Sequence, residues 1–569
     1  MKARGALPAA PAEGGFLRTS AAGIGLNALP RGLRALVVAG AAAIVCVLAV
    51  HLVAIGRQRP WWDEIYVNST GLSIARSQPP IPSVLAQYPG TDSPIRFYGP
   101  VSFEASALLI RLFGISPVLW RYLCVSGLAL TLAAAVALLR LAGADPAGQV
   151  LGALLLALGG SIADLQRYGR WDFVTSGLFL CGLYLCLRAV VADGRGLGWR
   201  AAAGGAFLGL ALGSTPRALT LSAAAAVSFL AAGAVFTGLR RRLSLAALIA
   251  FFAASSTHAL LLLPWGLTPW SWYAYVRKAA SLDKGNLTSA LGEGGWGLGL
   301  GIHKASYLVL LSLLVLGAAG ALSRRGEFSR AGREDFVRFV LTAFGVVNLC
   351  LMMVVVSQAL GQPAFWLPGI VLAAACWFEW RLIGASRPAV AATIFAAGLS
   401  LLILSAQQAQ QVAAILLSWQ QRSSSRLDAF VQKSIPRKVA VYGVTDGYFY
   451  AVEGAGDQYL IYWEQARDGL ASEPDASIAQ KVEQRLCAGP AFVIWPKPIS
   501  LDPSAKWSMP AALRDRLQPA IGELVQPPIP AWKWSLLLRL GPVAGKFGFP
   551  DAVLYPLRSL NPPHSCPGS

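Results

Sequence analysis

The chain has 569 residues, of which 55% are hydrophobic and 13% are charged, and its mean hydropathy is +0.54. This balance excludes an ordinary soluble domain and indicates a large membrane protein built from bundled helices. The 48 Lys and Arg residues against 28 Asp and Glu would suggest nucleic-acid binding in a soluble protein. Here the basic residues fall in short loops between apolar runs, so we expect membrane lipids and no nucleic acid as partners.

The first 32 residues form a basic segment that we expect to be disordered and cytoplasmic. The first apolar run, 33–55, follows this segment and lacks a small-residue cleavage site after it, which favours a retained anchor over a signal peptide. Further runs long enough to span a membrane bring the expected number of spans to about eleven. They are 118–141, 147–165, 173–192, 201–214, 217–238, 245–264, 305–322, 336–357, 366–384 and 389–406.

The odd number of spans places the remaining segments relative to the membrane, here expected to be a bacterial inner membrane. A cytoplasmic N-terminus puts two large loops, 56–117 and 265–304, on the non-cytoplasmic side, together with a tail from 407 to 569. The tail carries strand-like pieces at 439–444, 459–463 and 491–496 and a helical pattern at 477–487. We therefore predict an α-helical polytopic membrane module over 33–406 and a small α/β domain outside the cytoplasm.

Both outer loops have features of a membrane surface. In the first loop, 63–76 and 100–113 are apolar on one face, as expected of helices lying along the surface. The second loop gathers aromatic and cationic residues, which indicates interfacial anchoring or binding of an anionic headgroup.

An acidic pair follows the first span in PWWDEIYVNST, 60–70. One interpretation is that Asp63 caps a helix beginning at Glu64 while Trp61 and Trp62 anchor the interface. The other makes Asp63 a general base, and the two are compatible.

A second cluster, QRYGRWD at 166–172, joins two spans on the same side as the acidic pair. Ionisable groups there are costly unless paired or functional, so they are either a structural Arg–Asp pair or a site with Asp172 as a second acid and arginines facing a phosphate. The turn STPR at 214–217 also leaves two interpretations open. Arg217 either snorkels to the membrane surface or lines an outward cavity.

The histidines and cysteines form no zinc pattern, and GEGGWGLGLG at 292–301 lacks the strand and lysine of a nucleotide loop. Cys487 and Cys566 both fall in the outer tail, where they are either disulfide-bonded or two free thiols. Adjacent carboxylates leave two cofactor options open, a divalent cation or none.

Taken in order, WWDEIYV, RFYGPVSFEASALLIRLFGIS and RYGRWD resemble the glycosyltransferase C superfamily. The similarity is to the branch of dolichyl-phosphate-mannose protein mannosyltransferases and bacterial aminoarabinose transferases, and STPRAL and QPAFWLP fall where that branch has comparable turns. It extends over about the first 400 residues. The branch commonly has His or Lys and two prolines where this chain has Tyr98, Gly99 and Pro100, so Arg96 would have to supply that cation.

The resemblance implies inverting transfer of a sugar from a polyprenyl-phosphate carrier to an acceptor hydroxyl on lipid A, another glycan or a protein. It implies Asp63 as base, with Glu64 and Asp172 as further acids. Cations are needed over the leaving phosphate. The candidates are Arg96, Arg167, Arg170, Arg217, Lys278, Lys284 and Lys304. The alternatives are a transporter or lipid-linked sugar flippase, and a scaffold whose tail binds a partner.

Overall fold

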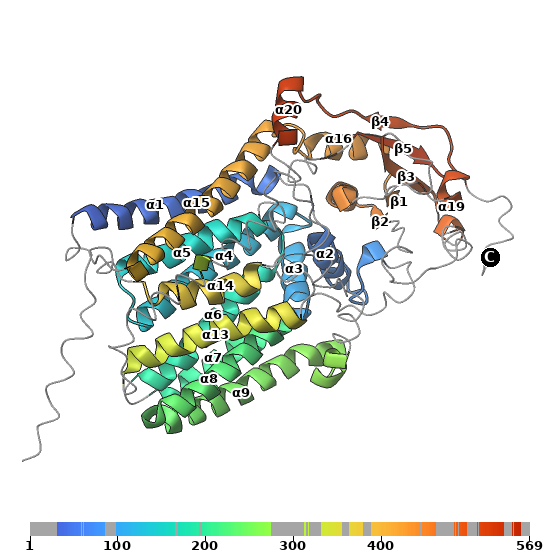
Figure 1. Ribbon diagram of the computed structural model, residues 1–569. Coiled ribbons are helices and arrows are strands. Elements are labelled where there is room, and N and C mark those ends of the chain that lie inside the picture. Colours follow the sequence, from blue (N-terminus) through green and yellow to red (C-terminus); the bar gives the residue numbers. More distant parts are fainter. Residues whose placement is uncertain are drawn as a thin grey trace, which may run out of the picture.

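The structure is a computed structural model of the full chain. It describes residues 31–57, 60, 62–85, 98–164, 169–192, 196–274, 312, 313, 317, 332–355, 363–378, 388–443, 446–461, 483, 485–487, 489–497, 509, 511–539, 549 and 551–558. A helical bundle and a smaller C-terminal domain make up this part of the chain, with the domain beyond one end of the bundle, next to α2 and α3 (Figure 1).

Long apolar helices form the bundle. They are α1 (Arg31–Ala54), α4 (Pro117–Leu141), α5 (Pro146–Asp164), α6 (Asp172–Val191), α7 (Leu197–Ser214), α8 (Ala218–Val235), α9 (Arg240–Leu262), α13 (Arg333–Val355), α14 (Pro363–Ala375) and α15 (Pro388–Leu417). Seven of the described helices are long and apolar enough to cross a membrane, and two shorter apolar helices accompany them. The chain is therefore a multi-pass membrane protein, as predicted. The expected span 305–322 lies almost wholly outside the described residues.

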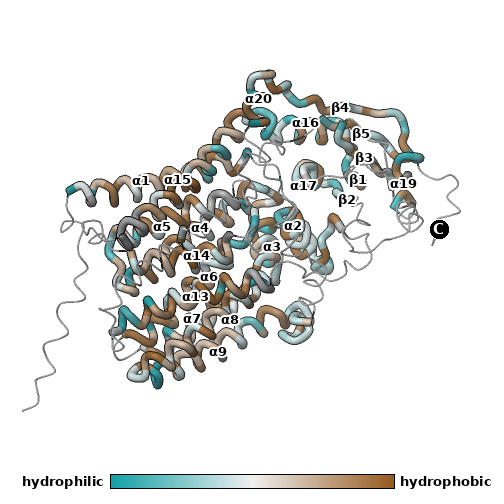
Figure 2. The backbone as a smooth tube through the Cα atoms, viewed as in Figure 1, coloured by the Kyte–Doolittle hydropathy of each residue, from teal (hydrophilic) through white to brown (hydrophobic). Residues whose placement is uncertain are grey.

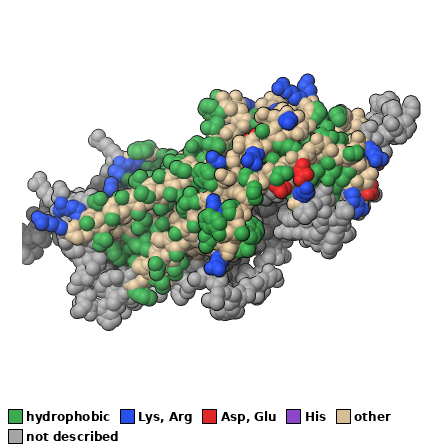
Figure 3. All heavy atoms as spheres, turned by 90° about the horizontal axis from the view of Figure 1, so that it is seen from above, with side chains coloured by type: hydrophobic (Ala, Val, Ile, Leu, Met, Phe, Trp, Pro, Cys, Tyr) green, Lys and Arg blue, Asp and Glu red, His purple; other side chains and the backbone are tan. Residues whose placement is uncertain are grey.

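The bundle is hydrophobic outside as well as inside. Leu36 is 68% exposed, Leu230 76% and Phe395 70%, which suits contact with lipid tails. Hydrophobic residues run along the helices of the bundle (Figure 2). Seen from the side of α1 and α15, hydrophobic side chains cover the bundle, while charged ones gather at its ends and over the C-terminal domain (Figure 3). Inside, small residues allow close packing, since a Cβ on Gly205 of α7 would lie 2.3 Å from the Ala250 carbonyl oxygen of α9.

The basic turns between spans meet at the end of the bundle opposite the C-terminal domain. Arg242 at the start of α9 donates to the Ala192 carbonyl after α6 at 3.3 Å. Arg338 of α13 donates to the Ala142 carbonyl after α4 at 2.8 Å. This arrangement agrees with the expected basic inner side, and the sidedness itself stays a prediction.

The two helices expected in the first outer loop are present and differ in exposure. On α3 (Pro100–Phe113), Leu108, Leu112 and Phe113 are exposed, as a helix at a membrane surface requires. In contrast, α2 (Trp62–Ala75) is buried from residue 64 to residue 73, because α3, the turn η3 (Ser83–Leu85) and the C-terminal domain cover it. The expectation of a surface helix is met by α3, whereas α2 is enclosed.

The C-terminal domain contains a five-stranded sheet in the order β2-β1-β3-β5-β4. The strands β1 (Ala440–Gly443), β2 (Gln458–Ile461) and β3 (Ala491–Pro496) are parallel, while β5 (Ala552–Pro556) is antiparallel to β3 and to β4 (Gly522–Leu524). The first three were predicted and the last two were not. Residues Ala440 to Gly443 pair with Gln458 to Ile461 on one side and with Ala491 to Ile494 on the other, so β1 lies between β2 and β3.

Short helices and a disulfide complete the domain. The helices are α16 (Ser425–Ser434), α17 (Phe449–Gly454), α19 (Ala511–Arg514) and α20 (Ala531–Arg539). Helix α15 continues to Leu417, beyond the expected end of the last span at 406. In the predicted helix 477–487, the described residues 483 and 485–487 are helical. Cys487 is disulfide-bonded, and its expected partner Cys566 lies outside the described residues.

Candidate active site

The acidic pair lies in the first turn of α2, at the end of the bundle that faces the C-terminal domain. Helix α2 begins at Trp62, so Asp63 is already helical and does not take the capping position expected for it. Both carboxylates still stabilise the start of the helix, because the helix dipole places partial positive charge there. The site is therefore built on a helix terminus rather than on a free loop.

Arg170 joins Asp63 to the RYGRWD turn. Its Nη2 lies 2.6 Å from Oδ2 of Asp172 in the first turn of α6, and its Nε lies 3.4 Å from Oδ2 of Asp63. The expected Arg–Asp pair is thus present, and it extends to the acidic pair. The Asp63 side chain keeps 19% of its surface exposed, against 6% for both Arg170 and Asp172. Asp63 is accordingly the most accessible of the three.

Tyr98 brings a phenol to the same group. Its hydroxyl donates to Oδ1 of Asp172 at 3.5 Å. Burial raises the pKa of Tyr98 well above its ordinary value; the charges of Asp172 and Asp63 raise it further, while those of Arg170 and Arg217 oppose the shift. All four charged groups therefore act on one buried hydroxyl, which stays protonated at neutral pH.

Arg217 reaches this region through two turns that lie against each other. The Gly99 backbone N–H donates to the Ser214 carbonyl oxygen at 2.8 Å. A Cβ on Gly99 would lie 2.2 Å from the Gly213 carbonyl oxygen, so the close approach requires glycine. Arg217 is partly exposed and makes no ion pair with a carboxylate of the described residues. Its charge is left available for an anion.

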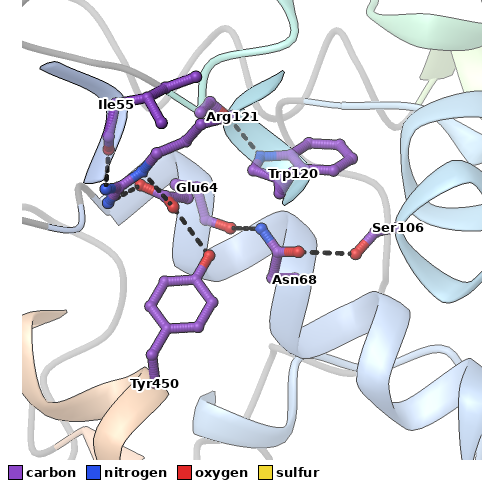
Figure 4. A network of polar contacts seen from close by, with 8 residues as sticks. Ile55, Glu64, Asn68, Ser106, Trp120, Arg121 and Tyr450 are labelled. Atoms are coloured by element: carbon purple, nitrogen blue, oxygen red, sulfur yellow. Dashed lines mark hydrogen bonds and ion pairs between the residues drawn. The ribbon is translucent and has the colours of Figure 1, made fainter. Parts of the chain in front are cut away.

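Glu64 occupies a different environment from Asp63 (Figure 4). Arg121, near the start of α4, donates from Nε to Oε1 of Glu64 at 2.9 Å and from Nη2 to Oε2 at 3.0 Å. A third donor, Nη1 of Arg121, binds the Ile55 carbonyl at 2.9 Å. The Glu64 side chain is completely buried and that of Arg121 is 2% exposed. The sequence interpretation missed Arg121, although a lone arginine in the first turns of an apolar helix is the pattern that points to such a buried pair.

The α2 helix is also fixed by Asn68 and by the glycine turn before α6. Asn68 donates to its own helix at the Glu64 carbonyl and accepts from Ser106 of α3, each at 2.9 Å. Gly169 has φ +91°, and a Cβ there would lie 2.6 Å from Cδ of Glu64. Trp120 donates to the Gly169 carbonyl at 2.8 Å and stacks on Trp171. The turn therefore closes directly on the Glu64 carboxylate.

Several predicted residues fall outside the described part of the chain. These are Trp61, Arg96, Arg167, Lys278, Lys284 and Lys304. Among the predicted residues that are described, Asp63, Asp172 and Arg170 are brought into contact. The charge of Arg217 acts on the Tyr98 hydroxyl, which donates to Asp172. Within the described ranges, no group of three or more His, Cys, Asp and Glu residues is placed to hold a metal ion.

The solved structures that are similar to this chain include two structures of ArnT from Cupriavidus metallidurans, one bound to undecaprenyl phosphate and one in the apo state. Each is 13% identical with a TM-score of 0.49, covering 93% and 92% of this chain and 98% of ArnT. A third is the archaeal oligosaccharyltransferase AglB from Archaeoglobus fulgidus, in complex with an inhibitory peptide and a dolichol-phosphate. It is 14% identical over 80% of this chain and 69% of AglB, with a TM-score of 0.48.

No protein-family model and no curated protein matches the chain. Because identities and TM-scores are this low, these structural likenesses carry no argument about function.

Proposed function

We propose that this protein is an inverting membrane glycosyltransferase that moves a sugar from a polyprenyl-phosphate carrier to an acceptor hydroxyl, with Asp63 as general base. The observation that supports it best is the partly exposed Asp63 carboxylate held beside Arg170 at one end of an apolar bundle. Such a place is open both to a lipid-linked donor and to a water-borne acceptor. The donor class follows from the resemblance of the sequence motifs.

Each described group has a part in this reaction. Asp63 accepts the proton of the attacking hydroxyl, which makes the oxygen a better nucleophile toward the anomeric carbon. The carrier phosphate leaves with negative charge, which Arg217 is free to stabilise. Arg170 links Asp63 to Asp172, so Asp172 orients the cation rather than taking the proton. Glu64, buried under Arg121, positions α2. Arg96, Arg167, Lys278 and Lys304 remain proposed phosphate ligands from the sequence.

The acceptor is a glycan, a lipid such as lipid A, or a protein, and the reaction takes place on the non-cytoplasmic face of the membrane. The basic turns at the opposite end of the bundle support this face, because the positive-inside bias assigns such turns to the cytoplasm. Activated sugars on that face have to arrive on a lipid, which agrees with a polyprenyl-phosphate donor.

The test is sugar transfer by purified full-length protein, supplied with a panel of polyprenyl-phosphate sugars and with glycan, lipid A and peptide acceptors. We expect Asp63→Asn to lower kcat by at least about 100-fold, the loss typical of a missing general base. Glu104→Gln is the matched control, because Glu104 is an exposed acid on α3 of the same loop. Full activity of Asp63→Asn would remove Asp63 as base. No transfer with any donor, together with lipid-linked sugar movement across vesicles, would instead support a flippase.

A further inference from the structure

Tyr450 of the C-terminal domain reaches into the site. The hydroxyl of Tyr450, on α17, donates to Oε1 of Glu64 at 2.8 Å. The same oxygen accepts a hydrogen bond from Nε of Arg121 at 2.9 Å. In Figure 4 the tyrosine projects from the domain toward the carboxylate, with Arg121 on the other side of it. The buried carboxylate is therefore shared between the bundle and the C-terminal domain.

The same short helix also binds the other end of α2. Arg76, just after α2, places Nη2 3.1 Å from Oε2 of Glu453 on α17. The Tyr459 backbone N–H donates to the other carboxylate oxygen at 3.1 Å, which ties Glu453 to the sheet of its own domain. As a result, α17 contacts α2 at both ends, near Glu64 and at Arg76.

Apolar residues of the two helices belong to one buried cluster. Phe449 and Val452 of α17 are fully buried in one hydrophobic cluster with Ile65 and Val67 of α2. Burial raises the pKa of Tyr450 well above its ordinary value, and the nearby Glu64 carboxylate adds to the shift. The phenol is therefore protonated throughout the neutral range and always available as the donor to Glu64.

We propose that the C-terminal domain completes the active site, with Tyr450 as a positioning residue that holds the start of α2 so that Asp63 stays beside Arg170. The inference rests on the proposed glycosyl transfer. Asp63 and Glu64 are adjacent in the same helical turn, so movement of one carries the other with it. A displacement of about 1 Å at a reacting group is enough to cost about 100-fold in rate.

The test compares Tyr450→Phe with Tyr442→Phe in the full-length protein. Both substitutions remove one buried phenolic oxygen from the same domain, but the Tyr442 hydroxyl has no hydrogen-bond partner among the residues that the structure describes. We expect Tyr450→Phe to lower kcat by about 10- to 100-fold, the effect of losing a hydrogen bond to a charged group, and to leave the donor KM unchanged. Tyr442→Phe should retain the kcat of the wild type.

Hydrogen exchange supplies a readout that does not depend on activity. In Tyr450→Phe the α2 backbone over 62–75 should exchange faster, while α4 and α6 exchange as in the wild type. A Tyr450→Phe variant with wild-type kcat and unchanged exchange in α2 would overturn the inference, while a loss in Asp63→Asn would still support glycosyl transfer. If the wild type transfers no sugar, the proposed function fails, and faster exchange confined to α2 would still support the positioning of α2 by α17.

Discussion

Arg121 and Glu64 form a bidentate ion pair in which both side chains are almost completely buried. Breaking such a pair is far more costly than its net contribution suggests, because the remaining charge stays buried without compensation. We expect Arg121→Met to lower the free energy of unfolding by about 3–5 kcal/mol, measured by denaturant unfolding in detergent.

The double variant Arg121→Met with Glu64→Gln is the control for this pair. It removes both charges, so it should regain much of the loss, because a neutral amide is cheaper to bury than a carboxylate. Equal stability of the single and double variants would show that the uncompensated Glu64 charge is not the cause.

Gly169 should not tolerate a side chain. Alanine there adds a collision with the Glu64 carboxylate to the strain of a left-handed backbone. Gly114 is the matched control, because its φ of +77° carries similar strain while nothing lies within 4 Å of a Cβ there. We expect Gly114→Ala to cost about 1–3 kcal/mol of unfolding free energy and Gly169→Ala to cost about 1–3 kcal/mol more. Equal losses would contradict the tight closure of this turn.

The contact between α17 and α2 should depend on pH through Glu453. Burial raises the pKa of Glu453 from 4.5 to about 7, outweighing the attraction of the partly exposed Arg76. Between these two pKa values the unfolded chain releases a proton that the folded chain keeps. The contribution of Glu453 to the free energy of unfolding is therefore fully present below pH 4.5 and is lost as the pH rises through 7. The fall is at most about 3 kcal/mol. Glu453→Gln should abolish it, as measured by unfolding of the full-length protein from pH 5 to 8.

Arg217 should act on the donor. We expect Arg217→Gln to lower kcat/KM for the polyprenyl-phosphate sugar by about 10- to 100-fold, since a charge-assisted bond to phosphate is lost. Arg240→Gln is the control, because Arg240 is exposed at the opposite end of the bundle and should behave as the wild type. A wild-type kcat/KM in Arg217→Gln would remove this residue from the phosphate site.

The sequence by itself determined the membrane module and the order of its polar motifs. Long apolar runs have few alternatives to spanning helices, so most expected spans match helices within a few residues. The spacing of acidic and basic motifs between spans also placed Asp63, Asp172 and Arg170 at one end of the bundle. Strands β4 and β5 were not predicted, because such short strands carry little periodic signal. They depend on pairing, β5 with β3 and β4 with β5.

Only the tertiary structure decided which charges are paired and which remain available. Asp63 and Glu64 are neighbours in sequence, yet one is partly exposed and the other is sealed under Arg121. Tyr450, which donates to the Glu64 carboxylate, is 386 positions away in the chain. Local periodicity predicts the face of a helix, but the choice of a buried ionic partner depends on how distant segments pack, because the cost of burying a charge is offset only by the groups that packing brings to it.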